Sequence, residues 1–199
     1  MRKSAAYILL VIIFAAIALL FWYNEWVYSL PTPVPKNYSV VHNGKHIDLP
    51  PELQWDNNKP VELHFFNPDC PCSRFNIPHF QSLVKEFGHE VNFAIVVMSD
   101  RKYSAEEITD KFKLDLPVSS DTALATLCGV YSTPQAVVID TMKKLYYRGN
   151  YNKSRYCTGK ETDYTRIALE TLLGRSKNTG FNQFALKAYS CELPHCTKE

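Results

Sequence analysis

Two cysteines separated by one residue, Cys70 and Cys72, are the side chains of this chain best suited to chemistry. They follow a short apolar strand expected at 60–66, and the spacing of apolar residues over 73–87 predicts a helix directly after them. A cysteine at the start of a helix lies among unpaired backbone N–H groups, at the positive end of the helix dipole. Both effects stabilise the nucleophilic thiolate and can lower a thiol pKa from about 8.5 into the range of about 3.5 to 7.5. The position therefore predicts a reactive thiol at Cys70.

The sequence leaves the partner of Cys70 open. A disulfide from Cys70 to Cys72, the favoured partner, would close a small, strained ring that is easily reduced and hence oxidising. Alternatively, Cys70 works alone through mixed disulfides, or a distant thiol resolves them. In the plainest interpretation both cysteines are buried apolar residues without chemistry.

The elements that must position these cysteines alternate between strands and helices. Further helices are expected at 104–113, where Ser-Ala-Glu-Glu forms a capping-box pattern, at 121–128 and at 162–173. Further strands are expected at 91–98, 135–140 and 144–147, and a hairpin around Asn43-Gly44 joins 39–42 to 45–49. This order predicts an α/β sandwich, with a mixed central sheet flanked by helices.

The first 28 residues predict a transmembrane signal-anchor. Residues 5–23 carry no charge, and a helix needs roughly 20 such residues to cross a bilayer. Arg2 and Lys3 precede this run and aromatic residues follow it, so we expect a single pass with a cytoplasmic N-terminus. The domain would then lie on the periplasmic side of the inner membrane. The competing interpretation is a cleaved signal peptide, which exports the domain as well.

The rest of the chain divides into a proline-rich spacer at 29–37, a domain at 38–175 and a C-terminal extension at 176–199. The extension holds Cys191 and Cys196, which in an exported domain most simply form a structural disulfide. Cys128 and Cys157 can pair with each other, pair with the extension or stay unpaired, and the sequence does not choose among these connectivities.

Over about 38–174 the chain resembles the thioredoxin superfamily, and the separation from Cys70 to Pro134 looks like that of its TlpA-type and peroxiredoxin (AhpC-type) branches. Cys70 falls on the family's attacking cysteine, but Ser73 falls on its resolving cysteine. Gly129-Val130-Tyr131-Ser132-Thr133-Pro134 looks like the family loop that ends in a cis-proline beside the active cysteine. The resemblance implies a thioredoxin-like sandwich in which the backbone of Thr133 pairs with an extended substrate peptide.

His64 lies six residues before Cys70, where thioredoxins bury a carboxylate that handles the proton of the resolving thiol. An imidazole can perform that transfer because its pKa lies near neutral pH. The alternative is a structural histidine that is hydrogen-bonded within a covered strand.

The leading hypothesis is a membrane-tethered thiol–disulfide oxidoreductase that acts on the thiols or disulfides of exported proteins. It would use no cofactor besides its own thiols, and a redox partner of unknown identity would recharge them. The net charge of +2, with scattered Lys and Arg, gives no case for nucleic-acid binding.

Three alternatives remain. A Cu(I) metallochaperone would use the two clustered cysteines with His64, His79 or the His195-Cys196 pair, and resembles the Sco proteins, whose cysteines stand farther apart. A thiol peroxidase resembling peroxiredoxins would need Pro and Thr where this chain has Leu63 and Asn67. A binding module would keep the fold without thiol chemistry.

Overall fold

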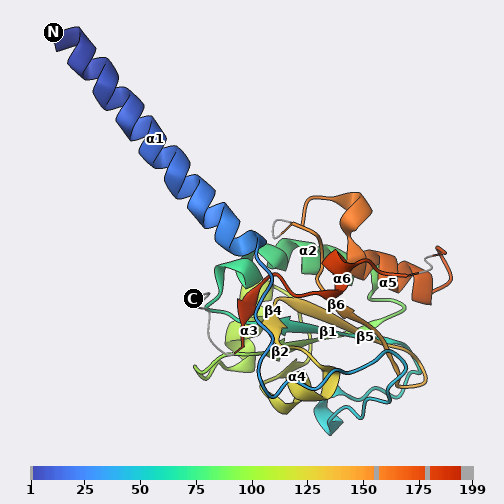
Figure 1. The fold of residues 1–199 in the computed structure, drawn as a ribbon. Coiled ribbons are helices and arrows are strands. Elements are labelled where there is room, and N and C mark those ends of the chain that lie inside the picture. Colours follow the sequence, from blue (N-terminus) through green and yellow to red (C-terminus); the bar gives the residue numbers. More distant parts are fainter. Residues whose placement is uncertain (1, 155–156, 178–179, 194–199) are drawn as a thin grey trace. The chain divides into compact units, whose positions relative to one another are not determined.

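The structure is a computed structural model that describes residues 2–154, 157–177 and 180–193 (Figure 1). The chain divides into two compact units, Met1–Pro31 and Thr32–Glu199. The first unit is one helix, α1 (Arg2–Ser29). Its segment Lys3–Tyr23 is long and apolar enough to cross a membrane, a property that signal sequences share.

A five-stranded mixed sheet forms the centre of the second unit, in the order β3-β2-β1-β5-β6. The strands β1 and β2 are parallel, as are β2 and β3, whereas β5 runs antiparallel to both β1 and β6. The bounds are β1 (Val61–Phe66), β2 (Asn92–Val97), β3 (Val118–Ser119), β5 (Gln135–Ile139) and β6 (Leu145–Gly149). The parallel strands need crossover connections, and α2 (Pro71–Phe87) and α3 (Ala105–Phe112) supply them.

Helices cover both faces of this sheet, as Figure 1 shows for α2 and α5 (Tyr164–Leu172) on one face and α4 (Ala123–Cys128) on the other. Side chains alternate along β1, so Phe66 packs with α2 and α3, whereas Leu63 and Phe65 pack with α4. Every residue of β1 is buried, including the two polar residues Glu62 and His64. The polar groups of these two side chains must therefore find hydrogen-bond partners inside the protein. Short helices complete the unit: η1 (Pro51–Leu53), η2 (Lys160–Thr162) and α6 (Gln183–Leu186).

Most of the expected elements are present, and the capping box at Ser104 and Glu107 is formed as the sequence predicts. The hairpin at 39–49 is not. Residues 39–42 form no strand, and Gly44 and Lys45 instead exchange backbone hydrogen bonds with Leu145 at the start of β6. The Asn-Gly turn itself forms, with φ of 85° at Gly44. This segment uses the edge of the central sheet as its partner because that edge offers unpaired backbone groups.

The folded unit begins at Thr32, inside the segment expected to be a spacer. The buried Thr32 backbone N–H donates to the carbonyl of Ala188 (2.8 Å), and its hydroxyl lies 3.3 Å from that of Ser132. The C-terminal extension also docks, because β7 (Cys191–Glu192) pairs antiparallel with β4 (Ser132–Thr133) in a second, two-stranded sheet. Thr32 and β7 thus both lie beside the loop that precedes β5.

Candidate functional site

A disulfide joins Cys70 to Cys191, 121 residues apart in sequence. The expected pairing of Cys191 with Cys196 is therefore not the one formed, and Cys196 itself lies outside the described residues. The reason is tertiary: in the β4–β7 pair Thr133 lies opposite Cys191, and this pairing carries the extension to the start of α2.

Cys70 is the N-cap residue of α2, with extended backbone angles, and Pro71 occupies the first helical position, where its missing N–H costs no hydrogen bond. The turn before it is closed by a hydrogen bond from the Cys70 amide to the carbonyl of Asn67 (3.1 Å). The hydroxyl of Ser73 accepts a hydrogen bond from the backbone N–H of Asn67 (3.2 Å). Ser73, at the position of the family's resolving cysteine, thus stabilises the turn that presents Cys70.

Cys72 is buried and is not part of the disulfide. Its sulfur nevertheless belongs to one group with the sulfurs of Cys70 and Cys191, because all three lie within 4.8 Å of one another. The structure thus brings together the two cysteines that the sequence singled out and adds a third from the C-terminal extension.

The peptide bond between Thr133 and Pro134 is cis, as the resemblance implies. The backbone position expected for a substrate strand beside Thr133 is taken by Cys191 of the same chain. The disulfide therefore joins the cysteine at the start of α2 to β7, the strand that pairs with the cis-proline loop.

His64 lies in a buried polar group rather than among the sulfurs described above. Its Nδ1 lies 2.6 Å from the hydroxyl of Tyr151, which in turn donates to Oε1 of Glu62 (2.6 Å), and its ring stacks on Phe80 with centroids 4.3 Å apart. The direction of the hydrogen bond between His64 and Tyr151 depends on the tautomer of the imidazole. The buried Nε2 of His64 has no hydrogen-bond partner among the described residues. These contacts favour the structural interpretation of His64.

Burial controls the protonation of both β1 side chains. It lowers the pKa of His64 from 6.5 to about 3, with a further contribution from the nearby His79. It raises the pKa of Glu62 from 4.5 to about 8, against the opposing effect of the Tyr151 hydrogen bond. At neutral pH, His64 is thus neutral and Glu62 is largely protonated.

The remaining described cysteines are free thiols on opposite sides of the sheet. Cys128, the last residue of α4, is buried in the core, and Cys157 accepts a hydrogen bond from Nδ2 of Asn76 (3.1 Å). Burial raises the pKa of each thiol from 9.0 to about 12. Neither forms the disulfide that the sequence left open, and both are protonated at neutral pH.

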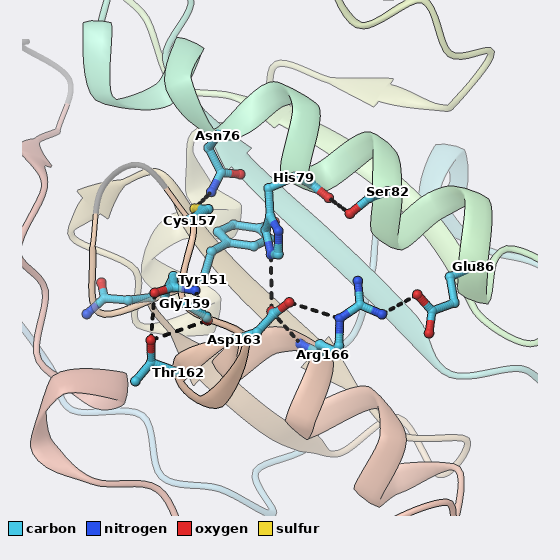
Figure 2. A network of polar contacts seen from close by, with 12 residues as sticks. Asn76, His79, Ser82, Glu86, Tyr151, Cys157, Gly159, Thr162, Asp163 and Arg166 are labelled. Atoms are coloured by element: carbon cyan, nitrogen blue, oxygen red, sulfur yellow. Dashed lines mark hydrogen bonds and ion pairs between the residues drawn. The ribbon is translucent and has the colours of Figure 1, made fainter.

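Near Cys157, a network of charged side chains ties α5 to α2 (Figure 2). Asp163, the N-cap of α5, pairs with Nε2 of His79 (3.1 Å) and with Nε of Arg166 (2.9 Å), and Arg166 reaches Glu86. Burial alone would raise the pKa of Asp163, but its bonds to His79 and Arg166 hold it below its usual value. His79, one of the ligands considered for copper, is thus engaged by a carboxylate.

Sequence reasoning did not identify Cys191 as the partner of Cys70, nor Glu62 and Tyr151 as partners of His64. A charged residue inside an otherwise apolar strand was a visible signal for Glu62. Nothing in the spacing indicated Cys191, because its contact with Cys70 depends on the docking of the extension.

A mixed sheet between helices, with a cis-proline loop linked through β7 to a cysteine at the start of α2, is a thioredoxin-like fold, and the fold expected from the sequence is confirmed. No curated protein matches the chain in sequence. Among solved structures, a hypothetical protein of Sinorhizobium meliloti is similar with a TM-score of 0.62 and 15% identity, over 79% of this chain and 96% of that one. An uncharacterized conserved protein of Geobacillus kaustophilus is similar with a TM-score of 0.59 and 16% identity, over 79% and 94%. Residues 39–193 match the family described as a domain of unknown function (DUF6436), and the chain therefore belongs to that family.

Proposed function

We propose that this protein is a thiol–disulfide oxidoreductase of the TlpA/AhpC-type branch, tethered to the inner membrane by α1, that acts on exported proteins through Cys70. The observation that carries the proposal is the disulfide between Cys70 and Cys191, formed at the start of a helix and beside the cis-proline loop. A thiolate at a helix N-terminus is stabilised by the helix amides, which favours Cys70 as the attacking group.

Cys191 serves as the resolving thiol in this proposal. Ser73 stands where relatives carry that thiol, and a hydroxyl forms no disulfide. Its oxygen accepts a hydrogen bond from the Asn67 amide instead. The bond from Cys70 to Cys191 supports the assignment because resolution would end in that same disulfide.

The reaction consists of two thiol–disulfide exchanges. The Cys70 thiolate attacks a disulfide of the exported protein, forming a mixed disulfide, and the first substrate sulfur leaves as a thiolate that takes up a proton. The Cys191 thiolate then attacks the sulfur of Cys70, which forms the Cys70–Cys191 disulfide and releases the second substrate thiolate. Two electrons pass to the substrate, and the reverse sequence oxidises it. A separate dithiol or disulfide partner would restore the starting state.

The substrate would bind as an extended peptide along β4. In the oxidised protein Cys191 occupies the backbone position opposite Thr133. Displacement of β7 would leave the backbone groups of β4 open to strand addition by a peptide that carries a cysteine.

Trapping of mixed disulfides tests the proposal. Cys191→Ser should accumulate disulfides between Cys70 and exported proteins, because the resolving step is lost, whereas Cys70→Ser should trap none. Cys128→Ser, which removes a thiol from the opposite core, is the matched control and should behave as wild type. Equal trapping by Cys191→Ser and wild type, with a Cys70–Cys72 disulfide in the oxidised protein, would remove Cys191 from the mechanism.

The location is tested separately. Protease added to spheroplasts should degrade the domain while a cytoplasmic marker survives. N-terminal sequencing of the mature protein decides between a retained anchor and a cleaved signal peptide.

A further inference from the structure

The sulfurs of Cys70, Cys72 and Cys191 form a compact group that the disulfide chemistry does not fully use. All three side chains are buried, and their sulfurs lie within 4.8 Å of one another. A trigonal site with metal–sulfur distances of about 2.3 Å has sulfur–sulfur edges of about 4.0 Å. Once the disulfide is reduced, only small movements of the sulfurs would bring them to that spacing.

The ligand types select the ion. The group contains sulfur alone, and thiolates favour Cu(I), whereas carboxylates and carbonyls favour Mg²⁺ and Ca²⁺. Structural zinc sites almost always have four ligands. Among the described residues, three side chains of the metal-binding types come together here, and all three are cysteines. A set of three sulfurs, which is the set that the described part of the chain brings together, suits a three-coordinate, monovalent ion.

Two of the histidines considered from the sequence, His64 and His79, are held elsewhere, and His195 lies outside the described residues. The ring of His64 lies between Tyr151 and Phe80, and His79 pairs with Asp163. The third ligand comes instead from the extension, since β7 carries Cys191 to the start of α2.

The local field favours negative charge at this place. Cys70 is the N-cap of the 17-residue helix α2 and Cys72 occupies its second position, so the helix dipole offsets part of the charge of the thiolates. The nearest carboxylate in sequence, Asp69, receives hydrogen bonds from Tyr103 (2.6 Å) and Ser99 (2.9 Å).

We infer that the reduced protein binds one Cu(I) ion through the sulfurs of Cys70, Cys72 and Cys191. An added dithiol first donates two electrons and two protons to the Cys70–Cys191 disulfide and becomes a disulfide itself. Cu(I) then displaces the three thiol protons and forms three copper–sulfur bonds, without a change in its oxidation state. The metal and the disulfide therefore exclude each other, and the binding requires no turnover of a protein substrate.

The test uses the full chain in detergent, reduced with dithiothreitol, freed of the reductant and kept under anaerobic conditions. Titration with Cu(I) against the competing chelator bicinchoninate should give one bound ion per reduced chain and none per oxidised chain. Cys72→Ser and Cys191→Ser should each lose this stoichiometric binding. The matched controls Cys128→Ser and Cys157→Ser should retain it, and X-ray absorption should report sulfur ligands only.

A second measurement on the wild type requires no substitution. Bound Cu(I) should protect Cys70, Cys72 and Cys191 together from iodoacetamide, as mapped by mass spectrometry, while the alkylation of Cys128 and Cys157 stays unchanged. Wild-type affinity in Cys191→Ser, copper bound to the oxidised chain, or protection of fewer than these three thiols would overturn the inference. If the reduced wild type binds no copper but Cys191→Ser still traps mixed disulfides, the metal site is rejected and the proposed oxidoreductase function is not affected.

Discussion

The hydroxyl of Thr32 donates a hydrogen bond of 2.6 Å to the carbonyl oxygen of Ser190, 158 residues farther along the chain. The backbone N–H of Ser190 returns a bond to the same hydroxyl oxygen (3.0 Å). One side chain near the start of the domain thus satisfies both backbone groups of the residue that precedes Cys191. This contact holds β7 against β4 and Cys191 beside Cys70.

Thr32→Val should therefore loosen the extension. Valine keeps the volume but removes the two hydrogen bonds to Ser190 and the contact with the Ser132 hydroxyl, so we expect the free energy of unfolding to fall by about 1–3 kcal/mol. Dithiothreitol should also reduce the Cys70–Cys191 disulfide faster, because the strand that holds Cys191 detaches more often. Denaturant unfolding and timed alkylation of the released thiols measure the two effects. Thr126→Val, at an exposed position of α4, is the control, and identical behaviour of the two variants would show that Thr32 does not hold the extension.

The Cys70–Cys191 disulfide should stabilise the domain because it closes a long loop. Reduction, or Cys191→Ser, is expected to lower the free energy of unfolding by about 2–5 kcal/mol. Cys72→Ser should keep the Cys70–Cys191 disulfide in a peptide map of the oxidised protein. A loss of that disulfide in Cys72→Ser, or a stability that reduction leaves unchanged, would contradict this prediction.

Glu62 should make the protein less stable as the pH rises from 4.5 to about 8. Its pKa is about 8 in the folded protein and 4.5 ordinarily, so between these values the folded state holds a proton that the unfolded chain has released. The stabilisation is complete below pH 4.5 and is lost as the pH rises towards 8. Glu62→Gln keeps an acceptor for Tyr151 without a titrating group and should flatten this decline. Denaturant unfolding from about pH 5 to about pH 9 measures this decline in stability. An equal decline in the wild type and in Glu62→Gln would refute the assignment.

His64 should limit stability at acidic pH. Its pKa is about 3 in the folded protein and 6.5 ordinarily, so between these values the unfolded chain binds a proton that the folded state excludes. Its contribution is present above pH 6.5 and is lost as the pH falls towards 3. Together with Glu62, this gives a stability maximum between about pH 4.5 and 6.5. His64→Asn should reduce the acid limb of the profile while the alkaline limb persists, and loss of both limbs together would contradict separate titrations.

Asp163→Asn should separate α5 from α2. It leaves His79 and Arg166 without their carboxylate in a largely buried place, and we expect a loss of about 3–5 kcal/mol in the free energy of unfolding. Glu90→Gln breaks the half-exposed pair with Arg175 and should cost less than about 1 kcal/mol. Thermal unfolding of the two variants makes the comparison, and equal losses would show that the buried network contributes no more than a surface pair.

The sequence by itself determined the features that depend on local patterns. The apolar run of β2, the capping box at Ser104 and the helix that begins after Cys70 follow from neighbouring residues, because hydrogen bonds and apolar spacing act over a few positions. The cis bond before Pro134 came from the family resemblance carried by a short motif.

Only the tertiary structure decided which residues meet. Cys191 bonds to Cys70 because Thr32 and β4 dock an extension that has little periodicity of its own. Tyr151 connects Glu62 with His64 because the residues after β6 pass over the face of β1. Such contacts join positions about a hundred residues apart, and their energies arise from burial and pairing in the folded state, which local propensity does not encode.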